Sequence, residues 1–143
     1  MASLSADDQL TLIFENLQES MNPEILEDII RKEQRAPIIY WGTATTGKPH
    51  CGYFVPGLKI AQFLQAGCKV KILLADVHGF LDNLKAPKEL VEFRAQYYKH
   101  TITALLRAVN VPTDKLEFVL GSSYQYSPRY FEALLTLSTQ TSG

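Results

Sequence analysis

Hydrophobic residues recur at helical spacing near the start of the chain and predict two short helices. Ser5 and Asp8 form a capping box ahead of the first helix. Its apolar positions are Leu10, Ile13, Phe14 and Leu17. The second helix is expected to begin at Asn22-Pro23, as cap and first helical residue, with an apolar face made of Ile25, Leu26, Ile29 and Ile30. Residues 1–36 are therefore predicted to form a helical hairpin that braces the core of a larger domain.

Apolar runs and helical patterns then alternate along the rest of the chain. Strands are predicted at residues 38–41, 69–75 and 117–120. Helices are expected at residues 52–66, 87–109 and 127–137. The long helix is predicted to carry one apolar side: Leu90, Phe93, Tyr97, Thr101, Leu105 and Val109. Residues 42–48 are expected to be a loop, residues 76–79 a polar junction, and Gly67 a left-handed helix end.

This alternation defines the fold class. Strand, helix, strand, helix, strand is a βαβαβ unit, and crossovers of this kind join parallel strands. Residues 37–143 are thus predicted to be the first half of an α/β, Rossmann-like (HUP-type) nucleotide-binding domain. A parallel sheet normally has both faces covered. We therefore expect residues 37–143 to be a truncated catalytic domain, with its second half absent from the 143 residues.

Composition narrows the function classes. A 46% hydrophobic content disfavours disorder, and a net charge of −1 provides no overall polycation for nucleic acid. Two cysteines, Cys51 and Cys68, are too few for a disulfide scaffold, and no spacing indicates a metal site. The first eight residues lack the pattern of a signal peptide, and no segment is long and apolar enough to cross a membrane. A cytoplasmic protein without membrane contact is expected.

The segment after the first predicted strand supports two motif interpretations. Residues 42–48 fit the first seven positions of the phosphate-binding loop G-x-x-x-x-G-K, but Pro49 has neither the hydroxyl nor the N–H that the eighth position supplies. The second interpretation starts from His50 at a helix start, where an imidazole can donate to charge developing on a reacting phosphate. Gly52 would let a purine approach the backbone. We favour the second interpretation, although a histidine that merely caps a helix is the common alternative.

Three stretches in order resemble eukaryotic cytosolic tyrosyl-tRNA synthetases, a class I family. Residues 40–53, Tyr-Trp-Gly-Thr-Ala-Thr-Thr-Gly-Lys-Pro-His-Cys-Gly-Tyr, resemble the family's ATP-binding signature region. Residues 73–83 resemble a second hallmark, and residues 121–126 fall where the family has a third. The resemblance covers roughly residues 10–137, nearly the whole chain, and identifies it as the N-terminal part of a catalytic domain.

The resemblance implies ATP-dependent activation of L-tyrosine to tyrosyl-adenylate and transfer to tRNA(Tyr), with Mg²⁺ carried by the nucleotide. It places two catalytic residues in the signature "HIGH": His50 at the first histidine and Tyr53 at the second, where the phenol departs from histidine but still donates a hydrogen bond. The implied ATP-binding residues are Gly42, Thr43, Thr45, Thr46, Gly47, Lys48, His50 and Gly52. The implied L-tyrosine-binding residues are Tyr40, Asp76, His78 and Gln125.

Several of these residues have ordinary structural alternatives. Tyr40 could be a core aromatic, and Asp76 and His78 could equally cap the turn at Phe80. The threonines could simply be small residues suited to a tight loop. The residues alone leave these alternatives open.

The family's Lys-Met-Ser-Lys-Ser-like loop does not occur in the 143 residues. We therefore expect the chain to be inactive alone, with most of the family's homodimer interface missing. Two further hypotheses are a non-catalytic binding or regulatory fragment and a small nucleotidyltransferase with a HIGH-like motif. The match of residues 75–83 to synthetases argues against the second.

Overall fold

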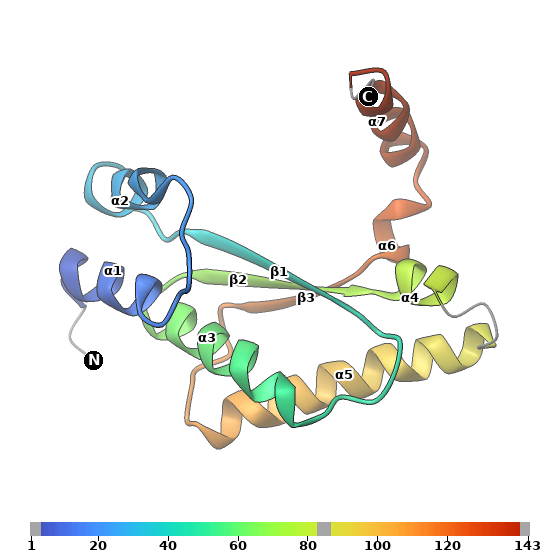
Figure 1. Cartoon of the computed structure of the whole chain (residues 1–143), viewed down its shortest axis with the longest axis horizontal. Coiled ribbons are helices and arrows are strands. Elements are labelled where there is room, and N and C mark those ends of the chain that lie inside the picture. Colours follow the sequence, from blue (N-terminus) through green and yellow to red (C-terminus); the bar gives the residue numbers. More distant parts are fainter. Residues whose placement is uncertain (1–3, 83–86, 141–143) are drawn as a thin grey trace.

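The computed structural model describes residues 4–82 and 87–140, and Figure 1 shows a helical hairpin beside a parallel sheet. The predicted hairpin and the predicted sheet domain include residues 1–3 and 141–143, which lie outside the described residues. Asn83 of the second hallmark also lies outside them. The strands are β1 (Ile38–Ala44), β2 (Lys69–Ala75) and β3 (Leu116–Leu120). The helices are α1 (Ala6–Phe14), α2 (Pro23–Arg31), the 3₁₀ helix η1 (Cys51–Tyr53), α3 (Phe54–Gln65), α4 (Asp76–Asp82), α5 (Lys88–Ala108), α6 (Ser122–Gln125) and α7 (Pro128–Ser138).

The described strands form one sheet in the order β1-β2-β3, and both pairs are parallel. The predicted βαβαβ unit is therefore confirmed. Alternate residues of β2 are buried between the sheet and the helices α3 and α5, which cover one face of the sheet (Figure 1). The buried residues of this core are Ile60, Ala61, Leu64, Val70, Ile72, Leu74, Ala95, Tyr98, Ile102, Leu106 and Val111.

The opposite face of the sheet carries polar and exposed side chains in the described residues. Lys71 of β2 pairs with Glu117 of β3 at 3.0 Å, and Tyr40 of β1 is 65% exposed. Since successive side chains of a strand point to opposite faces, Tyr40 lies on the same open face as Lys71, its partner in the β1–β2 register. The open face thus presents the first of the predicted tyrosine-binding residues.

The N-terminal hairpin packs on the sheet domain through a second apolar cluster. Leu10 and Ile13 of α1 and Ile30 of α2 are buried there with Ala66 and Cys68. Burial raises the pKa of the Cys68 thiol to about 11, which keeps it protonated. The ammonium of Lys59 adds a polar anchor, because it donates to two carbonyls at the end of α1.

The predicted capping box at Ser5 is confirmed, and it yields a stability prediction. The Asp8 N–H donates to Ser5 Oγ at 3.1 Å, and Ser5 Oγ–H donates to the Asp8 carboxylate at 2.6 Å. Replacing Ser5 by alanine leaves an N-terminal N–H of α1 without this acceptor, so we expect the free energy of unfolding to fall by about 1 kcal/mol. Urea unfolding followed by circular dichroism measures the change. Ser20→Ala, at an exposed site between the two helices, is the control expected to leave it unaltered.

Four local expectations were wrong. β1 continues through Ala44 instead of ending at Trp41, and the predicted polar junction after β2 is helix α4. Asn22 makes no side-chain cap because its backbone is left-handed, with φ 52°. On α5 the buried residues are Val91, Ala95, Tyr98, Ile102 and Leu106, whereas Leu90, Phe93, Tyr97 and Val109 are exposed.

Candidate active site

The predicted site residues gather where the three parallel strands end. β1 leads into residues 45–50, β2 leads directly into α4, and β3 leads into α6, all at one edge of the sheet (Figure 1). Ligands of open parallel sheets bind outside the carboxyl ends of the strands. This edge is therefore the candidate active site.

His50 stands at the entry to η1 with its imidazole exposed and oriented by the backbone. The Gly52 N–H donates to His50 Nδ1 at 3.1 Å. Because Nδ1 accepts this bond, the neutral imidazole carries its proton on Nε2, which leaves Nε2–H as a donor. Gly52 is required for this arrangement, since a Cβ there would lie 2.7 Å from His50 Cε1. Gly52 thus makes room for the imidazole, in addition to its expected function of letting a flat purine approach the backbone.

Tyr53 packs against neighbouring aromatic rings, including that of His50, and its hydroxyl makes hydrogen bonds within the protein. Its ring makes edge contacts with His50 and Tyr98, with centroids 5.5 and 5.4 Å apart. The Tyr53 hydroxyl is 2.9 Å from Thr43 Oγ1 and donates to the Tyr98 hydroxyl at 3.4 Å. Burial and the Tyr53 phenol raise the pKa of Tyr98 to about 12, so Tyr98 is neutral at physiological pH.

The remaining predicted ATP-binding residues divide between strand and loop. Gly42 and Thr43 belong to β1, where Gly42 pairs with Leu73 of β2. Their backbone is therefore committed to the sheet, which excludes the G-x-x-x-x-G-K phosphate loop as an arrangement of residues 42–48. Gly47 and Lys48 are exposed in the loop that follows.

The two threonines of this loop differ in environment. Thr45 is fully buried, and its Oγ1 has no hydrogen-bond partner within the described residues. The backbone of Thr45 lies so close to Gly79 of α4 that a Cβ on Gly79 would be 3.3 Å from the Thr45 nitrogen. Thr46 is partly buried. Thr45 thus packs against α4. The accessible part of the loop consists of Thr46, Gly47 and Lys48.

Three of the four predicted tyrosine-binding residues converge at this edge. Asp76 is buried at the start of α4, and its Oδ1 accepts the N–H of Ser122 at 2.9 Å. A Cβ on Gly121 would lie 2.9 Å from Asp76 Oδ1 and 2.7 Å from Gln125 Oε1, so these two oxygens flank the same glycine. Gln125 Oε1 is buried without a hydrogen-bond partner in the described residues.

Tyr40 approaches the same group from β1. Its hydroxyl lies over Gly42, where a Cβ would stand only 2.8 Å away. Burial raises the pKa of Tyr124, and Tyr130, Tyr40 and Asp76 raise it further. The fourth predicted residue, His78, lies exposed on α4.

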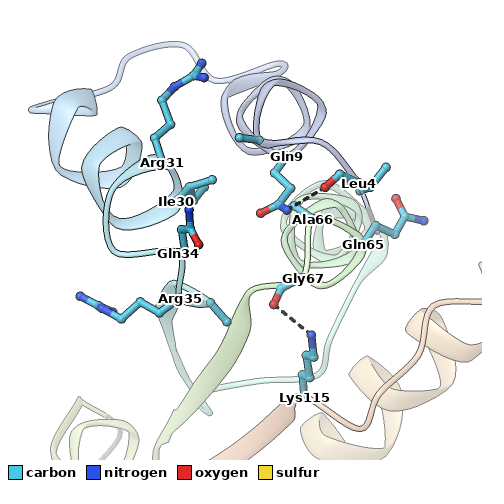
Figure 2. A pocket seen from close by; sticks show the side chains of 12 residues that line it. Leu4, Gln9, Ile30, Arg31, Gln34, Arg35, Gln65, Ala66, Gly67 and Lys115 are labelled. Atoms are coloured by element: carbon cyan, nitrogen blue, oxygen red, sulfur yellow. Dashed lines mark hydrogen bonds between the residues drawn. The ribbon is translucent and has the colours of Figure 1, made fainter. Parts of the chain in front are cut away.

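A large hollow lies elsewhere, between the hairpin and the amino ends of the strands (Figure 2). It measures about 1120 Å³, and its lining includes Arg31, Arg35 and Lys115. Each of these cations already has a partner: Asp7 for Arg31, Glu33 for Arg35, and the Gly67 carbonyl for Lys115. The three cations of the lining thus already make contacts within the chain, and the hollow lies away from the candidate active site.

In residues 4–82 and 87–140 no group of three or more His, Cys, Asp or Glu side chains could hold a metal ion. Across that part of the chain, no helix has both the length and the apolar character of a membrane span.

Residues 32–142 match the family of tRNA synthetases class I (W and Y). The chain is 54% identical over 137 residues to cytoplasmic tyrosine–tRNA ligase of Saccharomyces cerevisiae, covering 96% of the chain and 35% of that relative. Cytoplasmic tyrosine–tRNA ligase of Danio rerio is 52% identical over 136 residues, covering 95% of the chain and 25% of the relative. The chain thus spans about a third or less of the length of these relatives.

Solved structures agree with this match. Tyrosyl-tRNA synthetase from Archaeoglobus fulgidus, complexed with L-tyrosine, superimposes with a TM-score of 0.83 at 31% identity. The superposition covers 96% of this chain and 41% of that one. The resemblance inferred from three short stretches of sequence is confirmed by matches over nearly the whole chain.

Proposed function

The chain belongs to the class I tRNA synthetases for tryptophan and tyrosine, and on that basis we propose that it forms the nucleotide- and tyrosine-binding half of a tyrosine–tRNA ligase active site. The proposed reaction joins L-tyrosine to ATP. The tyrosine carboxylate attacks the α-phosphorus and pyrophosphate leaves. The resulting tyrosyl-adenylate then transfers its acyl group to a hydroxyl of tRNA(Tyr), and AMP leaves. The observation that carries the proposal is that the segments bearing His50, Asp76 and Gln125 each follow the carboxyl end of one of the three parallel strands.

His50 and Tyr53 are the proposed catalytic residues on the nucleotide side. The Nε2–H of His50 points away from the Gly52 amide that holds Nδ1, so it is available to the α-phosphate as negative charge develops there. Tyr53 supports the ring of His50 through an edge contact, while its own hydroxyl is held by Thr43 and Tyr98. The proposed ATP-binding set is Gly42, Thr43, Thr45, Thr46, Gly47, Lys48, His50 and Gly52.

Within that set, Lys48 is the exposed cation of the loop and is suited to phosphate oxygens. Gly47 would meet nothing within 4 Å if it carried a Cβ, so its backbone borders open space where phosphates can approach. We place Mg²⁺ with the nucleotide, bound by its phosphates.

The proposed tyrosine-binding residues are Tyr40, Asp76, His78 and Gln125. Asp76 offers a carboxylate to the ammonium group of the amino acid, and Tyr40 on the open face offers a hydroxyl to the substrate phenol. Gln125 Oε1 is a buried acceptor that a substrate donor could satisfy. His78 is exposed on α4 and would bind at the rim.

For the complete protein we propose the partners and location that its relatives suggest. The relatives' names give tRNA(Tyr) and the cytoplasm. The homodimer is proposed from the family resemblance alone. The dimer interface is expected to lie mostly outside the 143 residues.

A chimera tests the proposed function. In the S. cerevisiae ligase the segment that matches this chain is replaced by residues 1–143, and tyrosine-dependent ATP–pyrophosphate exchange is measured. We expect exchange that requires L-tyrosine and is not supported by other amino acids. A folded chimera without exchange would contradict the proposal. The 143-residue chain, assayed beside the chimera, tests the expectation that it does not catalyse exchange alone.

A further inference from the structure

Tyr98 of α5 carries a buried phenol that lies against the loop of residues 45–50. Tyr98 is 2% exposed, and its oxygen accepts a hydrogen bond from the Tyr53 hydroxyl at 3.4 Å. The backbone of Gly47 lies near enough to this oxygen to oppose the rise in the pKa of the phenol. Tyr98 therefore lies, on α5, against both the loop of residues 45–50 and the 3₁₀ helix that follows it.

The same contacts extend to the end of β1 and to the imidazole. Thr43 Oγ1 lies 2.9 Å from the Tyr53 hydroxyl, which continues the chain of hydroxyl groups into the sheet. The ring of Tyr53 is in edge contact with both Tyr98 and His50. A displacement of the Tyr98 oxygen would thus alter the position of Gly47 and, through Tyr53, that of His50.

We propose that Tyr98 is a positioning residue for ATP, holding residues 44–50 and the ring of Tyr53 in the shape that binds the phosphates. This inference rests on the proposed function and deepens it. Tyr98 touches no substrate, because its side chain is enclosed between α5 and the loop. Its oxygen acts by accepting the Tyr53 O–H, which would otherwise lack this acceptor, and by lying close to the backbone of Gly47.

Tyr98→Phe isolates that oxygen, since the ring and its edge contact with Tyr53 remain. The neighbouring Tyr97→Phe removes the same atom from a side chain that is 52% exposed on α5, and it is the matched control. In the chimera we expect Tyr98→Phe to raise the KM for ATP about 3- to 10-fold, the loss of one neutral hydrogen bond. The KM for tyrosine should not change. A purely structural role would instead lower the amount of active enzyme and leave both KM values as they were.

Hydrogen exchange of the 143-residue chain gives a readout that needs no activity. We expect the amides of residues 45–48 and 50 to exchange about 3- to 10-fold faster in Tyr98→Phe than in the unsubstituted chain. Tyr97→Phe should leave them unaltered. Equal exchange in Tyr98→Phe and the unsubstituted chain, or an unchanged KM for ATP in an active chimera, overturns the inference. A chimera without exchange activity contradicts the proposed function instead, and the loop amides then decide the inference by themselves.

Discussion

Replacing His50 by alanine is expected to lower the kcat of ATP–pyrophosphate exchange in the chimera by about 10²- to 10³-fold. The reason is the oriented Nε2–H: the Gly52 amide holds Nδ1, so the imidazole can present its remaining proton to the α-phosphate without reorganising. A donor of this kind acts mainly on charge that exists in the transition state. The KM for tyrosine should therefore change little.

Two variants separate this explanation from a general loss of structure. His50→Gln places an amide NH₂ near the position of Nε2, and it should retain more activity than alanine. His100→Ala removes an exposed imidazole from α5 and should leave the rate unaltered. A His50→Ala chimera that exchanges at the unsubstituted rate would show that the histidine only caps η1.

The architecture could be predicted from the sequence because its signals are local. The strand at residues 69–75 was predicted with its observed bounds, and both the Ser5 cap and the left-handed Gly67, with φ 88°, are where the turn chemistry places them. α4 was missed because Asp76-Val77-His78-Gly79 has the composition of a turn. The helix forms there because Gly79 lets α4 lie directly against Thr45.

The long helix illustrates the limit of periodicity. α5 carries two adjacent apolar stripes, and the prediction chose the one that includes Phe93, which is 67% exposed. The buried stripe includes Ala95, Tyr98 and Ile102. Both stripes have helical spacing, so only packing against the sheet and α3 decides between them. Leu105 of the predicted stripe also packs on α3, where a Cβ on Gly57 would lie 2.0 Å from its Cδ2.

Tyr98 was missed for the same reason. Its neighbour Tyr97 fitted the predicted stripe, and nothing in a Tyr-Tyr pair indicates which phenol is buried. The signal that could have found Tyr98 is its spacing from Val91, Ala95 and Ile102. Its contact with Gly47 spans fifty residues of sequence and exists only because α5 crosses beneath the loop. The motifs could be predicted, but the side chain that supports them could not.

Replacing Tyr40 by phenylalanine is expected to weaken discrimination between tyrosine and phenylalanine by about 10- to 100-fold, the cost of leaving a buried phenol without its partner. Selection for a hydroxyl requires a polar group that the wrong substrate leaves unpaired, a rule for which ligases of this specificity are themselves the standard example. Tyr40 can provide this group because β1 presents it on the open face, and because Gly42 lets its hydroxyl lie back along the strand toward the site.

The measurement is the ratio of kcat/KM for tyrosine to kcat/KM for phenylalanine in ATP–pyrophosphate exchange by the chimera. Tyr126→Phe, which removes an exposed hydroxyl after α6, is the control and should keep the ratio of the unsubstituted chimera. An unchanged ratio in Tyr40→Phe would mean that the substrate phenol lies elsewhere. The tyrosine pocket would then have to be assigned to the buried acceptor of Gln125 and the carboxylate of Asp76, which flank Gly121 at the carboxyl end of β3.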